Sequence, residues 1–125
     1  MTSFRLLTVE LVEQAHDRVL NPGELPGRAL NKSLEGALSR VENRVAYGMI
    51  ADAYDLAAAY AMAIAQGHCF NDANKRTAFR AMQMTLVANG IQPRFDHEDI
   101  GNQIIALAQG IIDDGALADW LRDRA

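Results

Sequence analysis

The stretch from Ala53 to Gln66 constrains the fold of this chain most, because it is apolar on nearly every side when drawn as a helix. A helix without a polar face lies buried at the centre of a protein rather than on its surface. Alanine dominates this stretch, and the whole chain holds 21 alanines against 14 valines and isoleucines together. Because alanine favours helices and packs poorly in strands, we expect an all-α protein built around this central helix.

More helices are predicted on both sides of the central one, where apolar residues recur at helical spacing. The predicted set is 9–20 after a Thr8 cap, a helix from Asn31 or Ser33, a short piece near 44–50, the central helix, 74–88, a helix capped by Asp96 and Asp99, and a last one carrying Leu117 and Leu121. Gly67 is expected to stop the central helix. We therefore expect a compact bundle of about six to seven helices, forming a single domain over residues 1–125.

The charge and the cysteine content exclude several classes of protein. The chain has 12 basic and 16 acidic residues, a net charge of −4 and a pI near 5.2, which excludes a broadly basic surface for direct nucleic-acid binding. The acidic excess is concentrated in residues 96–125, with seven acidic and two basic side chains, so the rest of the chain can still form a local basic site. The single cysteine, Cys69, allows no disulfide within the chain.

Membrane and secretory segments are not expected either. The longest apolar stretch, Leu56 to Ala65, is too short to span a bilayer. Met1 to Leu7 lacks the charged region followed by a long apolar run that marks a secretory signal. We therefore expect a soluble cytoplasmic protein with no membrane partner.

A polar loop, defined as the nine residues from His68 to Arg76, follows the central helix directly and carries groups suited to chemistry. His68 has a pKa near neutrality by residue type and can take a proton from a hydroxyl nucleophile. Asp72 is a hard oxygen ligand of the kind that holds Mg²⁺ beside substrate phosphates. Asn74 can bridge a phosphate oxygen and the loop backbone, while Lys75 and Arg76 can pair with phosphate oxygens. The next helix begins here as well, and helix N-termini bind phosphate.

Each of these residues also has an ordinary structural interpretation. His68 can cap the end of the central helix or bond within the core, and Asp72 or Asn74 can cap the next helix. Lys75 and Arg76 can belong to a solvated face. Taken singly, the structural interpretations are favoured. The ordered set of five favours a site for phosphoryl transfer, which needs mainly positioning and charge neutralisation.

Three other residues are expected to be structural. His16 lies on the apolar stripe of the first predicted helix and is expected to be buried and hydrogen-bonded. Phe70 is expected to anchor the loop in the core. Cys69 has no neighbour in the sequence that would clearly lower the pKa of its thiol, so no reactive role is predicted for it.

The polar loop resembles the signature of the Fic/Doc superfamily, and most closely that of its death-on-curing (Doc) toxin branch. The loop of that branch reads His-x-Phe-x-Asp-(Gly/Ala)-Asn-Lys-Arg-Thr, and the residues here are His68, Cys69, Phe70, Asn71, Asp72, Ala73, Asn74, Lys75, Arg76 and Thr77. Similar features occur in the same order outside the loop, so the resemblance covers roughly residues 5–120. It implies a Fic-like helical bundle in which the loop leads into the following helix.

The chain departs from the wider Fic pattern, His-Pro-Phe-x-(Asp/Glu)-Gly-Asn-Gly-Arg-x-x-Arg, at Cys69, Ala73, Lys75 and Phe79. Members with that pattern typically transfer AMP from ATP to a target hydroxyl. Lys75 matters physically, because its side chain fills space where a phosphate approaches the glycine backbone. A triphosphate is then expected to bind in another orientation. This fits the Doc branch, whose members resemble kinases that present the γ-phosphate to the target.

The resemblance implies a role for each polar-loop residue: His68 as the catalytic histidine, Asp72 as the metal-associated acid, and Asn74, Lys75 and Arg76 as phosphate-handling positions. It also implies ATP and Mg²⁺ as ligands, and a Ser or Thr hydroxyl of elongation factor Tu as the target, with arrested translation as the consequence. Two alternatives stay open, a Fic-type AMP transferase and a catalytically inactive binding protein. Retention of the catalytic set speaks against the second.

A protein partner is implied by the same resemblance. Doc toxins of type II toxin–antitoxin systems are paired with a small antitoxin, whose disordered tail folds as a helix into a groove of the toxin. An acidic tail would need a locally basic groove on this acidic chain. Arg28, Arg40 and Arg44 are the candidates for that groove.

Overall fold

The computed structural model describes residues 3–124, and over that range the chain forms six α-helices and no strand. They are α1 (Val9–Val19), α2 (Leu34–Ala46), α3 (Ala53–Gly67), α4 (Asn74–Ala88), α5 (His97–Ala108) and α6 (Asp114–Arg122). The expected all-α class and helical bundle are confirmed. The prediction of a separate helical piece near 44–50 was wrong, because α2 continues to Ala46. Gly48 then turns the chain at a φ of 71°, a conformation that glycine adopts without strain.

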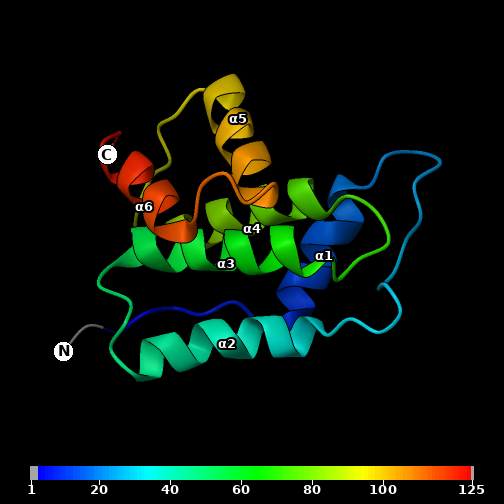
Figure 1. Ribbon diagram of the computed structural model, residues 1–125, viewed down its shortest axis with the longest axis horizontal. Helices are drawn as coiled ribbons and strands as arrows, with labels where there is room; N and C mark the ends of the chain where they lie inside the picture. Colours follow the sequence, from blue (N-terminus) through cyan, green and yellow to red (C-terminus); the bar gives the residue numbers. More distant parts are fainter. Residues whose placement is uncertain (1–2, 125) are drawn as a thin grey trace.

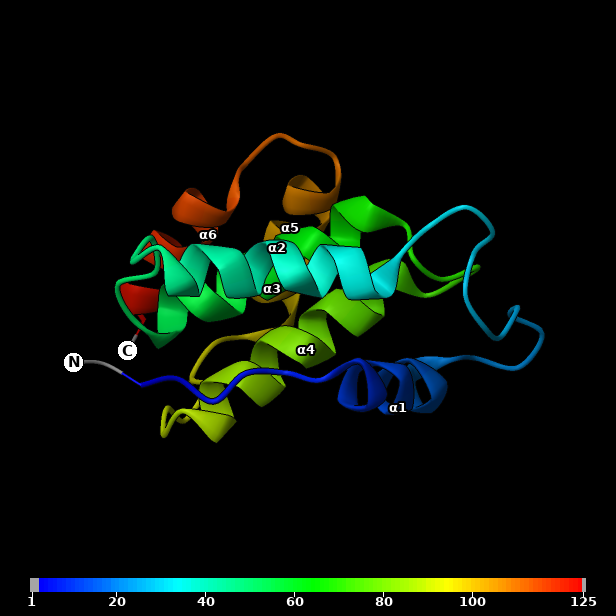
Figure 2. The same cartoon turned by 90° about the horizontal axis from the view of Figure 1, so that it is seen from below.

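Helix α3 lies at the centre of the bundle, as its apolar sequence predicts. It packs against α2, α4, α5 and α6, and Figure 1 shows it between α2 on one side and α5 and α6 on the other. Leu56, Tyr60 and Ile64 are completely buried, and the alanines beside them let the neighbouring helices approach closely. Figure 2, seen from below, shows α4 and α1 on a further side of this core.

Helix starts follow the capping signals in the sequence. The side chains of Thr8, Ser33, Asp52, Asp96 and Asp113 each accept a hydrogen bond from a backbone N–H in the first turn of the helix that follows, as N-cap residues do. Of the two predicted starts of this helix, Ser33 and not Asn31 is the N-cap of α2. Within residues 3–124, no helix has both the length and the apolar character needed to cross a membrane.

The connection between α1 and α2, residues 20–33, lies against the polar loop and is called the cover segment below. The N–H of Ala29 donates to the carbonyl of Cys69 at 2.9 Å, and the N–H of Asn71 donates to the carbonyl of Gly27 at 3.1 Å. Arg28 and Phe70 form an isolated antiparallel β-bridge at the same place. The cover segment therefore brings its own side chains next to the polar loop, although about forty residues separate the two in the chain.

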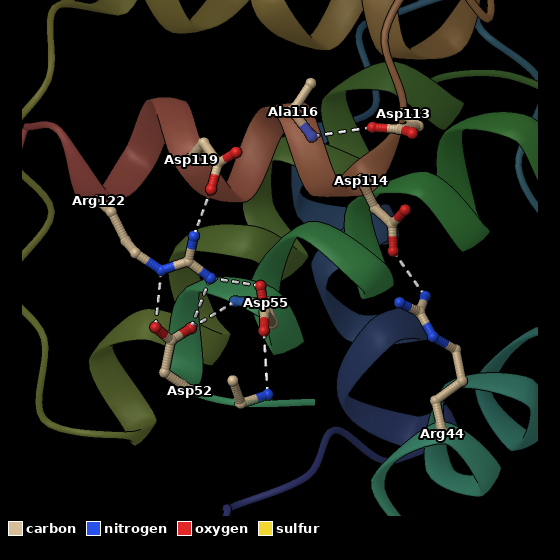
Figure 3. A network of polar contacts seen from close by, with 9 residues as sticks. Arg44, Asp52, Asp55, Asp113, Asp114, Ala116, Asp119 and Arg122 are labelled. Carbon is tan, nitrogen blue, oxygen red and sulfur yellow. Dashed lines mark hydrogen bonds and ion pairs between the residues drawn. The ribbon is translucent and has the colours of Figure 1, made fainter. Parts of the chain in front are cut away.

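A polar network ties α6 to the start of α3, as Figure 3 shows. The guanidinium of Arg122 donates to both oxygens of Asp52, at 2.7 and 3.2 Å, and also pairs with Asp55 and with Asp119. Asp52 is at the same time the N-cap of α3. The hydrogen bond from Arg122 is the main cause that holds the pKa of Asp52 below its ordinary value of 3.8.

We expect Arg122→Met to lower the free energy of unfolding by about 1–2 kcal/mol at pH 7, since the network is only partly buried and joins several charges. Because the pKa of Asp52 is lowered in the folded state, its ionised form stabilises the fold. That contribution is complete above pH 3.8 and is lost as the pH falls through the lower, folded pKa. Urea unfolding at several pH values measures the deficit, which should shrink in acid. Arg94→Met, an exposed position, is the control and should change little; an equal loss there would contradict the assignment.

Candidate functional site

His68 stands at the junction of α3 and the polar loop, in a backbone conformation that histidine rarely adopts. It is the C-cap of α3 with φ 49° and ψ 41°, and its side chain is exposed. The expected stop at Gly67 was therefore displaced by one residue, since Gly67 is the last residue of α3 itself. A left-handed residue other than glycine is strained by about 1 kcal/mol or more and is held by its surroundings. Here the left-handed residue ends α3, and its imidazole is exposed.

Asn74 holds the polar loop in shape. Its side-chain oxygen accepts a hydrogen bond from the N–H of Phe70 at 3.1 Å, and its side-chain nitrogen donates to the carbonyl of the same residue at 2.9 Å. Asn74 thus contacts the loop backbone, as predicted, and one N–H of its amide remains available for a phosphate oxygen.

His16 supports the polar loop from below. It is buried, with 1% of its surface exposed, and its ring stacks on Phe70 with centroids 3.9 Å apart. Its Nε2–H donates to the carbonyl of Asp72 at 2.9 Å. Phe70 and Cys69 are buried too, and burial raises the pKa of the Cys69 thiol, so all three residues have the structural roles expected of them.

The start of α4 leaves its backbone donors free. Neither Asp72 nor Asn74 caps the helix; Ala73 is the N-cap, in a left-handed conformation at φ 64°, and no side chain caps the first turn. Within residues 3–124, no acceptor is found for the N–H groups of Asn74, Lys75 and Arg76. Three free N–H groups and the positive end of the helix dipole make this helix start a candidate anion site.

A cavity of about 490 Å³ opens at this helix start and brings all five predicted site residues together. Its wall includes His68, Asp72, Asn74, Lys75 and Arg76. The rest of the lining comes from Glu24, Ala65, Asn71 and Ala73 and from the α5 residues Ile105, Ala108 and Gln109. A proton acceptor, a carboxylate and two cations therefore share one hollow with the free N–H groups, an arrangement suited to holding a polyphosphate beside a hydroxyl group.

Glu24 belongs to this cavity but was not predicted from the sequence. Its carboxylate pairs with the guanidinium of Arg76, which also donates to the carbonyl of Val19. The other oxygen of Glu24 accepts from the N–H of Asn21 at 2.6 Å. The hydrogen bond from Arg76 is the main cause that lowers the pKa of Glu24, so Glu24 is ionised near neutrality and offsets the charge of Arg76 in the cavity.

We expect Glu24→Gln to bind inorganic tripolyphosphate about three- to tenfold more tightly, because one negative charge leaves an anion site near the surface. Isothermal titration calorimetry at low ionic strength measures the change. Glu42→Gln removes the same charge from the exposed face of α2, outside the cavity, and should leave the affinity unchanged. Weaker binding by the Glu24 variant would instead mean that Glu24 holds Arg76 in its anion-binding position.

The carboxylate of Asp72 fits a role as a Mg²⁺ ligand. Its Oδ2 accepts a hydrogen bond from the N–H of Leu25 at 2.7 Å, which fixes the side chain against the cover segment. Within residues 3–124, no protein donor is found for Oδ1, which leaves that oxygen to a cation. The described residues contain no group of three or more His, Cys, Asp or Glu side chains placed to hold a metal. One carboxylate completed by substrate phosphates is the usual way in which proteins bind Mg²⁺.

The three arginines predicted for a basic groove do not lie together. Arg28 pairs with Glu13 and Glu35, at 2.6 and 2.5 Å, so its charge is neutralised and it does not form part of a free basic surface. Arg40 and Arg44 both line a cavity of about 260 Å³ between α2 and α3, and Arg44 is paired with Asp114 of α6. Arg40 and Arg44 therefore lie at one cavity as predicted, but the charge of Arg44 is offset by Asp114.

Comparison with known proteins gives two findings. The model of the Fic/DOC family matches residues 6–86, which is more than half of the chain. "Protein kinase doc" of Escherichia phage P1 is 38% identical over 113 residues, which cover 90% of this chain and 89% of that protein. Both matches include the polar loop and the start of α4.

Proposed function

The chain belongs to the Fic/DOC family, and from this premise we propose that it is the toxin of a type II toxin–antitoxin system. As a protein kinase, it would transfer the γ-phosphate of ATP to a Ser or Thr hydroxyl of elongation factor Tu and so arrest translation. The family membership and the relative's printed name support the kinase class. The single observation that carries the proposal is the cavity in which His68 lies beside the anion site of α4.

The proposed reaction uses the residues of the polar loop in order. The neutral imidazole of His68 accepts the proton of the target hydroxyl, whose oxygen attacks the γ-phosphorus. A bond forms between that oxygen and phosphorus, the bond from phosphorus to the β,γ-bridging oxygen breaks, and ADP leaves. Lys75, Arg76 and the free N–H groups of α4 neutralise the charge on the phosphate oxygens. Mg²⁺, when bound at Asp72, would supply further neutralisation of the β- and γ-phosphates.

Lys75 favours γ-phosphoryl transfer over AMP transfer. The residue occupies the first turn of α4 and lines the cavity. A side chain at this position takes up space that a glycine would leave for a phosphate close to the backbone. At the same time its ammonium group offers a compact charge to the terminal, most highly charged end of the triphosphate.

The proposed toxin also requires a protein partner, its antitoxin. An antitoxin with a disordered tail would cover the toxin, and the cavity bordered by Arg40 and Arg44 is the candidate surface for an acidic tail helix, with Arg40 as its cation, since Arg44 is paired with Asp114. The place of action would be the cytoplasm, where elongation factor Tu works. We treat residues 1–125 as one functional domain, since the proposed catalytic residues all lie at one cavity.

Mass spectrometry of purified elongation factor Tu, incubated with this protein, ATP and Mg²⁺, tests the target. The expected result is one added phosphoryl group on a Ser or Thr residue and loss of translation in a cell-free extract. An added adenylyl group would support the AMP-transferase alternative. An unmodified factor, together with undiminished translation, would contradict the proposed target and favour a protein that acts by binding alone.

A further inference from the structure

A second hollow, here called the α4–α5 cleft, lies next to the cavity described above. It has a volume of about 250 Å³ and is lined by Lys75, Arg76, Phe79, Gly101, Ile104 and Ile105. Its surface is almost wholly apolar, and it shares Lys75, Arg76 and Ile105 with the phosphate cavity. A ligand anchored by its phosphates at the start of α4 therefore has this cleft within reach of its other end.

Helical spacing explains why the two hollows are adjacent. Lys75 and Phe79 are four residues apart on α4, and Gly101 and Ile105 are four residues apart on α5, so each pair lies on one face of its helix. The α4 face passes from charged to aromatic over one turn. The α5 face opposite it combines an isoleucine with a glycine, which leaves a gap where most residues would fill space.

The aromatic wall of the cleft is held in place. The ring of Phe79 makes edge contacts with Phe95 and His97, at centroid distances of 6.5 and 6.1 Å. Both partners lie at the start of α5 or just before it, so they fix the Phe79 ring relative to the opposite wall. A flat ring entering the cleft would meet a preformed aromatic surface, which is the kind of lining that small-molecule sites present.

Resting on the proposed function, we propose that the α4–α5 cleft binds the base of the nucleoside triphosphate whose phosphates lie at Lys75 and Arg76. The apolar lining favours an apolar occupant, and the ring of Phe79 favours a flat one. Among the described residues, the charged walls of the cleft are those it shares with the phosphate cavity, so the occupant we favour is attached to a polyphosphate. A nucleobase meets both conditions. Gly101 and Phe79 are then specificity-determining residues for the nucleoside part of the ligand.

Gly101→Leu tests the inference, since a Cβ atom built at Gly101 meets nothing within 4 Å and a larger side chain would fill the cleft. Leucine also has a higher helix propensity than glycine, so the variant is expected to fold. Calorimetric titration compares ATP with inorganic tripolyphosphate, which shares the phosphates but has no nucleoside. We expect wild-type protein to bind ATP roughly 10- to 50-fold more tightly, and the variant to lose most of that advantage while its tripolyphosphate affinity stays unchanged.

Asn102→Leu is the matched control, because it adds the same side chain at the next, exposed position of α5, outside both hollows. It should leave both affinities as in the wild type. An undiminished preference for ATP in Gly101→Leu would overturn the inference, as would a variant whose only defect is a raised KM for the protein target. Failure of wild-type protein to bind either ligand would overturn the proposed function itself, so the two failures are distinguishable.

Discussion

Replacing His68 with asparagine is expected to lower the rate of phosphoryl transfer by about 10³-fold, since a positioned general base contributes roughly 10²–10⁴-fold. Asparagine is the informative choice because it tolerates the left-handed conformation of His68, at φ 49°, better than most residues do. The exposed imidazole makes no protein hydrogen bond within residues 3–124, so its loss should cost the fold little. Single-turnover measurements with a saturating protein target give the rate of the chemical step.

The fold and the ligand affinity serve as controls for this variant. Thermal unfolding and tripolyphosphate binding should match those of wild-type protein, because Lys75, Arg76 and the free N–H groups of α4 are the groups expected to hold the anion. In cells, the His68→Asn chain should no longer arrest growth. A variant that folds, binds ATP and still transfers phosphate at near the normal rate would exclude His68 as the general base.

The second large effect is expected from Asp72→Asn. The amide can still accept a hydrogen bond from the N–H of Leu25, so the cover segment should keep its place. The lost carboxylate weakens Mg²⁺ binding, and we expect phosphoryl transfer at limiting Mg²⁺ to fall by roughly 10²-fold, with the Mg²⁺ concentration for half-maximal rate shifted upward. Initial rates measured across a Mg²⁺ titration give both quantities.

Tripolyphosphate binding without Mg²⁺ separates this role from a structural one. Removal of a negative charge from the cavity should leave that affinity unchanged or raise it. A clear fall in affinity would mean that Asp72 mainly shapes the loop, through Leu25 and through the contact of its carbonyl with His16.

Much of the fold could be predicted because its signals are local. The all-round apolar character of α3 places it at the centre, and side-chain caps such as Thr8 and Asp52 mark helix starts. That the five candidate site residues line one cavity was predictable for a similar reason, since they lie within nine positions of one loop and the first turn of a helix. A short connecting loop cannot separate its own residues by much.

The rest depends on contacts between distant parts of the chain. Arg76 and Glu24 are 52 residues apart, and no local pattern indicates that the cover segment brings a carboxylate into a phosphate site. The left-handed conformations of His68 and Ala73 were missed as well, because glycine is the usual residue there and tertiary contacts decide the exception. The α4–α5 cleft arises only when Phe79 and Gly101 face each other across two helices.

Transfer of label from ATP marked at either the α- or the γ-phosphate tests the central claim most directly. Purified protein is incubated with elongation factor Tu, Mg²⁺ and each labelled ATP in parallel, with the His68→Asn variant as the blank. We predict that the target gains label from the γ-position alone, as required if Lys75 and the free N–H groups of α4 hold the terminal phosphate. Label gained from the α-position would contradict this account and assign the protein to AMP transfer.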